Sequence, residues 1–310
     1  MEKREYVRCA LCNSDDTDKF CERAGLKNRE AREVCNVLCK RCGLIYNNPM
    51  PSVGELKDFY SGGYLQDSTR FASGHEGAAV DAVKVKSTPK SERILDFIRE
   101  YLDSSSRVLD IGCGTGTLLR QIKQDIGCRV DGVEPDATMA KLARDHGGID
   151  LMENKFIDEF LANNTNNYDL IILRHVLEHL RNPNDTISSL RDILSETGYL
   201  FIVVPNAADF KPSKSLEHSL EYGHLYSFTP HTLNMLLVKN RMKAVKWSFD
   251  YVYSMQVVAT SVENPVDAVC FEDLLGGADI AKLKSRLRMH DYYLMLFRLK
   301  RKLKKLFGLK

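Results

Sequence analysis

Short apolar runs alternate with amphipathic stretches through the middle of the chain. The runs have the length and the branched aliphatic character of buried strands, and the stretches between them carry apolar residues at helical spacing. The pattern predicts strands near residues 107–111, 129–134, 149–152, 168–173 and 199–204. It predicts helices near 116–125, 137–146, 184–195 and 230–240. Regular alternation of this kind is typical of a parallel sheet with helices on both faces.

The flanking segments read differently from this alternating region. A helix is predicted over roughly 79–102 before the first strand, and two strands near 243–249 and 255–261 are predicted to close the sheet as an antiparallel pair. The sequence therefore divides into a cysteine-rich module, a Gly- and Pro-containing connector, the alternating domain and a C-terminal extension, over residues 1–48, 49–75, 76–262 and 263–310.

A glycine-rich turn follows the first predicted strand of the alternating domain. The segment reads Asp110-Ile-Gly112-Cys-Gly114-Thr-Gly116 and leads directly into a helix. Glycines let the backbone approach a ligand closely, and the start of a helix offers free N–H groups. A dinucleotide fingerprint needs glycine at the first, third and sixth positions, but here the sixth position is Thr117. A carboxylate beside the turn suits a cationic ligand better than a pyrophosphate.

A second acidic residue, Glu134, ends the next predicted strand about 20 residues after the turn. An acid at this place accepts the ribose hydroxyls in nucleotide-binding folds generally. Asp110 and Glu134 lie on either side of the alternating glycines, and together they indicate a positively charged nucleoside as ligand. The combination is a far more specific signal than either acid alone.

The cysteines indicate a metal site in the first module. Two Cys-x-x-Cys pairs, Cys9 with Cys12 and Cys39 with Cys42, have the spacing of zinc knuckles. Four thiolates close the coordination sphere of Zn²⁺, so a structural role is predicted. Unrelated buried thiols and a nucleic-acid-binding ribbon are the alternatives, and Cys21 and Cys35 are spare ligands. The nine cysteines form an odd total without a signal-like N-terminus, which favours reduced thiols and a cytoplasmic location.

With these motifs, the chain resembles the class I S-adenosylmethionine-dependent methyltransferases. It is similar within that class to the subgroup with an N-terminal four-cysteine zinc domain, which includes C-methyltransferases of nucleotide-linked deoxy-sugars. Further matching segments are Asn48-Pro49-Met50-Pro51, Tyr60, Tyr64, Leu173-Arg-His175-Val-Leu-Glu178-His179, Val204-Pro205-Asn206 and Gly223-His224-Leu225-Tyr226-Ser227-Phe228-Thr229. The resemblance implies a Rossmann-like seven-stranded α/β sheet with helices on both faces, S-adenosylmethionine as cofactor and structural Zn²⁺.

The resemblance also implies roles for individual residues. Asp110, Gly112 and Gly114 would line the methionine end of the cofactor, Gly116 would also contribute to cofactor binding, and Glu134 would hold the ribose. The remaining cofactor residues are placed beside the adenine (Phe156, Ile157) and near the sulfonium or the substrate entrance (Arg174, His175). The Glu178-His179 pair is open between a role at the site and a structural hydrogen bond.

The segment 206–231 is the predicted catalytic loop, because it follows the fifth strand at the carboxyl edge of the sheet. In the sugar C-methyltransferases the matching stretch reads Tyr-His-Glu-His, whereas this chain has Glu221-Tyr222-Gly223-His224. His224 is therefore the first candidate for a general base, with Glu221 and Tyr222 beside it, and its alternative is a structural histidine that ties the loop to the sheet. His218 and His231 in the same loop favour the structural interpretation.

The C-terminal segment is strongly basic. Residues 280–310 contain 11 Lys or Arg and a single acid, Asp291, although the whole chain carries only +2. Leucines recur at helical spacing from Leu296 to Leu306 among these charges, which predicts a basic amphipathic helix. Peripheral contact with the inner face of a membrane and packing against the acidic body are the two interpretations of this helix. A nucleic-acid arm is a third and less favoured one.

These observations predict an enzyme that methylates a sugar or glycan precursor, at oxygen or carbon, in polysaccharide or envelope biosynthesis. The alternatives are methylation of another small molecule or a lipid, or a zinc-ribbon protein that binds or modifies nucleic acid. The Asn/Asp-Pro-Pro-Tyr type of motif, typical of base and amide N-methyltransferases, is absent after the fourth strand, which lowers the nucleic-acid interpretation. The sequence leaves the acceptor open.

Overall fold

A computed structural model of the chain divides it into two compact units, which are described separately. The N-terminal unit comprises residues 1–75, 205–235 and 270–310, and the second unit comprises residues 76–204 and 236–269. The structure describes residues 4–26, 29–56, 89–209, 216–220, 223–249, 253–262 and 280–285, and within these ranges the side chains of 20–33, 89–90 and 217–218 are left aside.

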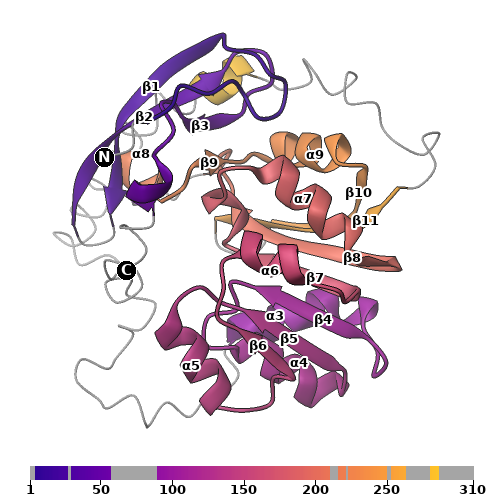
Figure 1. Cartoon of the computed structure of the whole chain (residues 1–310). Coiled ribbons are helices and arrows are strands. Elements are labelled where there is room, and N and C mark those ends of the chain that lie inside the picture. The colour runs from indigo at the N-terminus through magenta and orange to yellow at the C-terminus, as the bar shows by residue number, and fades with distance from the viewer. Residues whose placement is uncertain are drawn as a thin grey trace, which may run out of the picture. The chain divides into compact units, whose positions relative to one another are not determined.

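The second unit is built on a seven-stranded sheet in the order β10-β11-β8-β7-β4-β5-β6 (Figure 1). Its strands are β4 (Arg107–Ile111), β5 (Arg129–Val133), β6 (Leu151–Glu153), β7 (Tyr168–Arg174), β8 (Leu194–Pro205), β10 (Met242–Ser248) and β11 (Ser254–Ser261). Neighbouring strands from β6 through β8 are parallel, and β10 pairs with β11 in the antiparallel sense. The Rossmann-like methyltransferase sheet and the antiparallel pair of the prediction are thus confirmed.

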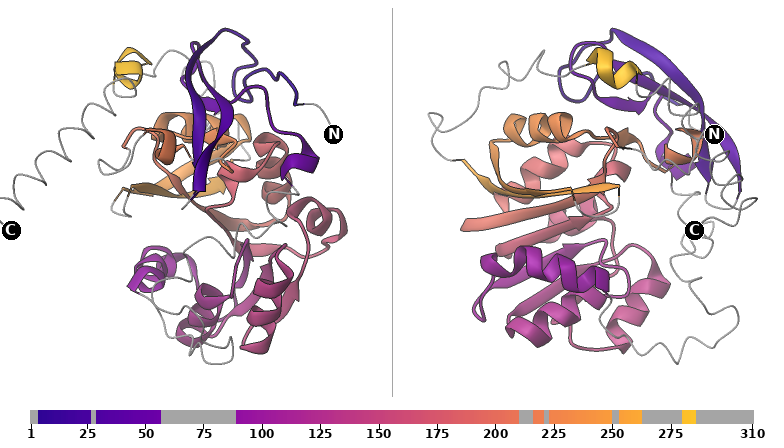
Figure 2. Two further views of the ribbon diagram at one scale, coloured as in Figure 1. Left: turned by 90° about the vertical axis from the view of Figure 1, so that its left-hand side faces the viewer. Right: turned by 180° about the vertical axis from the view of Figure 1, so that it is seen from behind.

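Helices flank both faces of this sheet (Figures 1 and 2). They are α3 (Pro89–Ile98), η2 (Arg99–Tyr101), α4 (Thr117–Ile126), α5 (Ala137–Asp145), α6 (Ile157–Asn163), η3 (Leu177–His179), α7 (Pro183–Asp192) and α9 (Pro230–Lys239). Of the helix predicted over 79–102, the structure describes only the part from Pro89, and the earlier residues lie outside the described ranges. The short helix α6 was not predicted.

The central strands are mostly apolar, as expected where helices cover both faces of a parallel sheet. In β7 every residue from Leu170 to Leu173 is fully buried. Val108, Leu170 and Phe201 from three neighbouring strands join one apolar cluster with Ile94 of α3 and Leu119 of α4. This core holds the carboxyl ends of β4, β5 and β7 side by side, which is where ligands bind in folds of this kind.

The N-terminal unit has its own four-stranded antiparallel sheet, in the order β1-β2-β3-β9. The strands are β1 (Thr17–Leu26), β2 (Arg29–Cys39), β3 (Ile45–Asn47) and β9 (Tyr226–Ser227). The last of these comes from the predicted catalytic loop, so residues 205–235 group by their contacts with the N-terminal segment. A small apolar core supports the pairing and contains Leu38, Ile45, Ala207, Leu216 of helix α8 (Leu216–Ser219), Leu220 and Leu283.

Most of the predicted basic helix lies outside the described residues. Residues 280–285 are helical, with Leu283 buried in the small core and Lys284 paired with Asp18 of β1. None of the helices in the described part of the chain has a stretch long and apolar enough to cross a membrane.

Candidate active site and cysteine cluster

The predicted glycine turn connects the end of β4 to the start of α4. Gly112, Gly114 and Gly116 all adopt left-handed backbone angles, with φ of 71°, 59° and 72°, which side chains with a Cβ rarely adopt. The N–H of Gly112 donates to the carbonyl of Val133 at the end of β5 at 2.7 Å, so the turn folds over the neighbouring strand. The alternating glycines therefore shape a tight bend at the carboxyl edge of the sheet.

Gly112 and Gly114 serve the turn for different reasons. A Cβ on Gly112 would come within 2.5 Å of Cγ2 of Val176, so the backbone after β7 packs directly against this glycine. A Cβ on Gly114 would meet nothing within 4 Å. Close packing against Val176 thus requires glycine at position 112, whereas Gly114 leaves open space where a ligand can lie close to the backbone.

Asp110 is buried at the end of β4 and is 1% exposed. Neither of its carboxylate oxygens has a hydrogen-bond partner within the described protein. Burial raises the pKa of Asp110 to about 7, against the positive charge of Arg174, which acts in the opposite direction. A buried carboxylate without partners is costly unless a ligand supplies a cation or donors, so this group is suited to receive one.

Glu134 follows β5 and is also buried, at 6% exposure. Its Oε2 accepts from the N–H of Gly114 at 2.8 Å, and its Oε1 accepts from the N–H of Asp136 at 3.0 Å. These two bonds fix the carboxylate against the glycine turn. The predicted contact of this carboxylate with ribose hydroxyls stays a prediction.

The two residues predicted beside the adenine lie after β6 and differ in exposure. Phe156 precedes the first residue of α6 and is 49% exposed, whereas Ile157 begins the helix and is buried. Asn154 ties this segment to the end of β5, because its side-chain amide donates to the carbonyls of Glu134 and Pro135 at 2.9 Å each. Phe156 is therefore the residue with a ring face available to a ligand.

The segment after β7 carries a constrained histidine. His175 has a left-handed φ of 56°, and its N–H donates to the carbonyl of Val203 in β8 at 2.8 Å. Its Nδ1 lies 3.3 Å from Oε1 of Glu178 in η3, and Glu178 is 1% exposed. The sequence left Glu178 open between a functional and a structural role, and it did not reveal this pairing.

The predicted catalytic residues belong to the N-terminal unit. The backbone carbonyl of His224 accepts a hydrogen bond at 3.3 Å from the side-chain amide of Asn47 in β3. His231 lies in the first turn of α9. The remaining members, Glu221 and Tyr222, lie outside the described residues, as does the side chain of His218. Their catalytic roles stay predictions.

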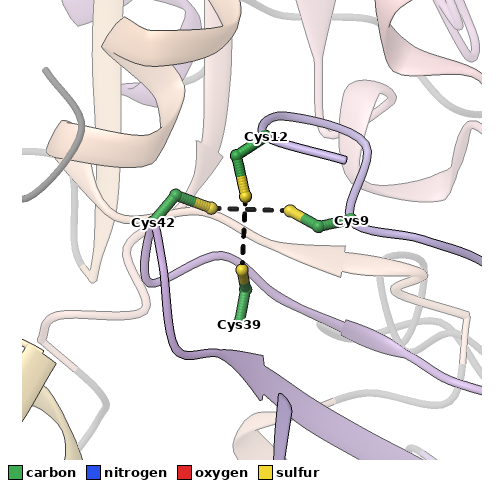
Figure 3. A group of neighbouring side chains, drawn as sticks. All are labelled: Cys9, Cys12, Cys39 and Cys42. Carbon is green, nitrogen blue, oxygen red and sulfur yellow. Dashed lines mark hydrogen bonds between the residues drawn. The ribbon is translucent and has the colours of Figure 1, made fainter. Parts of the chain in front are cut away.

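The structure brings the four predicted cysteine ligands together (Figure 3). The sulfur of Cys9 lies 3.4 Å from that of Cys42, and the sulfur of Cys12 lies 3.5 Å from that of Cys39. All four thiols are free, buried and within 4.8 Å of one another, whereas Cys35 is outside the group. The neighbouring thiols of Cys42 and Cys9 lower the pKa of the Cys39 thiol, so the cluster stabilises a thiolate.

The two cysteine pairs sit on equivalent turns. The N–H of Asn13 donates to the carbonyl of Cys9, and the N–H of Gly43 donates to the carbonyl of Cys39, both at 2.9 Å. Asn13 and Gly43 are left-handed, with φ of 57° and 77°. A zinc ion bound at about 2.3 Å would hold tetrahedral sulfurs about 3.8 Å apart. The donor set and its spacing therefore fit a four-thiolate metal site.

A comparison with known families decides what the second unit is. A family model described as a methyltransferase domain matches residues 87–241, half of the chain. The chain belongs to this family. The domain is of the class I S-adenosylmethionine-dependent kind, as its sheet order and glycine turn indicate.

Curated relatives of this methyltransferase domain share a name. The chain is similar to the ubiquinone biosynthesis O-methyltransferase of Glaesserella parasuis serovar 5 (strain SH0165), with 32% identity over 108 residues, 32% of this chain and 45% of the relative. It is 25% identical over 169 residues to the mitochondrial ubiquinone biosynthesis O-methyltransferase of Rattus norvegicus, covering 52% of this chain and 48% of the relative. The chain spans about half the length of the curated relatives it matches.

Solved structures of other methyltransferases are also similar. The magnesium protoporphyrin IX methyltransferase of Synechocystis PCC 6803, solved with bound S-adenosylmethionine, matches with 17% identity and a TM-score of 0.47, covering 66% of this chain and 94% of that one. A methyltransferase of Archaeoglobus fulgidus matches with 19% identity and a TM-score of 0.46, over 55% of this chain and 93% of that one.

The glycine turn of this methyltransferase domain fits the family's cofactor. S-adenosylmethionine carries a cationic ammonium group and a sulfonium, and Asp110 is a buried carboxylate that has no partner among the described residues. Gly114 leaves room for a ligand beside the backbone, and Glu134 lies against the same glycine. The negative charge of the carboxylates at the turn thus complements the positive charge of this cofactor and would repel a pyrophosphate.

Proposed function

We propose that the chain is an S-adenosylmethionine-dependent O-methyltransferase that acts on a hydroxyl group of a small molecule. The observation that carries the proposal is the buried carboxylate of Asp110, which has no hydrogen-bond partner among the described residues, together with the open space at Gly114. Membership of the methyltransferase domain family supports the reaction class. Transfer to oxygen is supported by the similar curated proteins, which are named O-methyltransferases.

Each part of the turn has a task in this proposal. The cofactor supplies an activated methyl group, so the protein mainly has to align it with the acceptor and exclude water. Asp110 would hold the ammonium group, Glu134 the ribose hydroxyls and Phe156 one face of the adenine. Arg174 and His175 would lie beside the reacting centre, because they stand at the end of β7 just before Val176, which packs on Gly112.

The finer acceptor class is a sugar or glycan precursor. The support is the resemblance of the four-cysteine module and of Gly223-His224 to the sugar methyltransferase subgroup, whose motifs extend beyond residues 87–241. A phenolic acceptor is the second candidate, because the curated relatives are named for ubiquinone biosynthesis. His224, Glu221 and Tyr222 remain the proposed residues on the acceptor side.

The cysteine cluster would bind a structural zinc ion in the N-terminal unit. Support comes from four buried cysteines in two matched turns, whose sulfurs lie within 4.8 Å of one another. A site closed by four thiolates offers no open coordination position, so it contributes to folding and not to the methyl transfer.

Calorimetry followed by an acceptor screen tests the proposal. S-adenosylmethionine should bind the wild-type protein, and Asp110→Asn should weaken binding strongly while the protein stays folded. The enzyme and cofactor are then incubated with catechols, nucleotide-linked sugars and lipid-linked glycans, and products are searched by mass for one added methyl group. Failure to bind the cofactor, or tighter binding of a nicotinamide dinucleotide, would overturn the assignment.

A further inference from the structure

His175 contacts Glu178 at the carboxyl edge of the sheet, and the cofactor roles proposed above leave this contact unexplained. Nδ1 of His175 lies 3.3 Å from Oε1 of Glu178, and the carboxylate is almost completely buried. The histidine itself retains 21% exposure of its side chain. One ring nitrogen thus meets a buried carboxylate while part of the imidazole reaches the surface of this unit.

The backbone holds this histidine in an unusual conformation. A residue with a side chain seldom adopts a φ of 56°, and such conformations cluster at functional sites where the surrounding structure enforces them. In this protein, contacts of His175 and of the following residue hold the backbone in this conformation. The N–H of His175 is bound to the carbonyl of Val203, and Val176 is packed against Gly112.

The neighbours of the pair place it beside the cofactor turn. Val176 would collide with any side chain at Gly112, the first glycine of the turn. Arg174, on the other side of His175, acts through its charge on the buried Asp110. Glu178 contacts the imidazole directly, and a ring nitrogen of His179 lies within 4.8 Å of a carboxylate oxygen of Glu178.

We propose that His175 is the general base of the methyl transfer and that Glu178 is its positioning residue. This rests on the proposed O-methylation and assigns its proton-transfer step. The acceptor hydroxyl gives its proton to Nε2 of His175 while its oxygen forms a bond to the methyl carbon. The carbon–sulfur bond breaks with its electron pair on sulfur, which becomes a neutral thioether. The Glu178 carboxylate holds Nδ1–H and stabilises the imidazolium, as the acid does in hydrolase triads.

The first test needs no acceptor. Protein labelled with nitrogen-15 in its histidines is saturated with S-adenosylhomocysteine, and the His175 signals are assigned by comparison with His175→Asn. We expect Nδ1 to carry the proton in the neutral ring and Glu178→Gln to change that tautomer balance. A ring protonated at Nε2 in the wild type, or a tautomer unaffected by Glu178→Gln, would overturn the proposal even if no acceptor has been found.

The second test uses catechol and 4-nitrocatechol as acceptors at saturating cofactor. His175→Asn is the preferred variant because asparagine tolerates the left-handed backbone. It should lower kcat for catechol by about 10²-fold or more and flatten the rise of kcat with pH. The loss should be smaller for 4-nitrocatechol, because its hydroxyl is more acidic. Glu178→Gln should lower kcat for catechol with little change in KM.

Two histidine variants serve as comparisons in that experiment. His146→Gln, after α5 in the same unit, should leave kcat and its pH dependence unchanged. His224→Gln tests the rival base. If that variant alone removes the pH-dependent rise, or if His175→Asn methylates both catechols like the wild type, His175 is not the base. If the wild-type protein binds the cofactor but methylates no hydroxyl acceptor, the proposed O-methylation is wrong. In that case only the tautomer measurement tests the pairing of His175 with Glu178.

Discussion

Asp110 shows how a single buried side chain links pH to ligand binding. Its pKa is raised from 3.8 to about 7, so the ligand-free protein holds a proton there below that pH. A bound ammonium group requires the carboxylate form, and binding must therefore release the proton. We predict that the Kd for S-adenosylhomocysteine rises by about tenfold for each pH unit below about 7. Calorimetry in buffers of different ionisation enthalpy measures the affinity and the released proton together.

Asp110→Asn is the control for this coupling between pH and cofactor binding. The variant also tests whether ionisation of Asp110 stabilises or destabilises the folded protein. A raised carboxyl pKa stabilises the folded state at low pH, and that contribution is lost as the pH rises through about 7. The asparagine variant should therefore bind cofactor weakly at every pH, yet gain stability relative to the wild type above pH 7. Equal pH dependence of binding in both proteins would rule out Asp110 as the titrating group.

Substitutions at Gly112 and Gly114 should separate an effect on folding from an effect on cofactor binding. Gly112→Ala places a Cβ against the stiff, β-branched Val176, so the backbone near His175 must move. Gly114→Ala meets no neighbour, and only its left-handed backbone costs roughly 1–2 kcal/mol. We predict a larger drop in the free energy of unfolding for Gly112→Ala, and for Gly114→Ala a loss of cofactor affinity that exceeds its loss of stability. Urea denaturation and calorimetry measure the two quantities.

At the scale of elements, the sequence predicted the second unit better than the first. The predicted strand at 107–111 matches β4 residue for residue, because a serine run precedes it and the glycine turn follows it. The strand predicted at 199–204 is longer, since β8 begins at Leu194. Its early residues, Ser195-Glu-Thr-Gly198, have the composition of a turn. They lie between the pairing of Leu194 with Tyr168 and that of Tyr199 with Leu170, where the register with β7 is irregular.

The pairing of β9 with β3 could not be read from the sequence. Tyr226 pairs with Tyr46, a contact between residues far apart in the chain, and a strand of two residues has no periodicity. The same reason explains what was missed at the site. The glycine turn is local and was predicted, whereas the packing of Val176 on Gly112 depends on the sheet that brings β7 beside β4.

From the paired cysteine turns we predict that metal binding and the stability of the N-terminal sheet depend on each other. Cys39 ends β2, so losing its sulfur should release both the ion and the end of that strand. We expect the purified wild type to contain zinc, and Cys39→Ser to lose it and to unfold at a lower temperature. Elemental analysis and thermal unfolding provide the measurement. Cys35→Ser is the matched control on the same strand, and if it lost as much zinc as Cys39→Ser, the four-sulfur assignment would be wrong.

On the scale of the whole molecule, the C-terminal segment has two parts. The structure describes residues 280–285, whereas residues 286–310 are interpreted from their sequence alone. Leu283 is buried in the small apolar core of the N-terminal unit, and Lys284 pairs with Asp18. Residues 286–310 contain nine Lys or Arg and a single acid. We propose that this last stretch contacts anionic membrane surfaces, because each basic residue near such a surface contributes on the order of 1 kcal/mol.

Two truncations separate these parts. Removing residues 286–310 should abolish sedimentation with phosphatidylserine-containing vesicles but leave the thermal unfolding and the affinity for S-adenosylhomocysteine unchanged. Removing residues 280–310 should also destabilise the N-terminal unit, since losing a buried leucine side chain typically costs about 2–5 kcal/mol. Wild-type sedimentation should weaken with added salt and disappear with pure phosphatidylcholine, because the attraction is electrostatic and screened by ions. If the shorter truncation sediments like the full chain, the basic segment is not a membrane anchor, and its charge serves the protein itself.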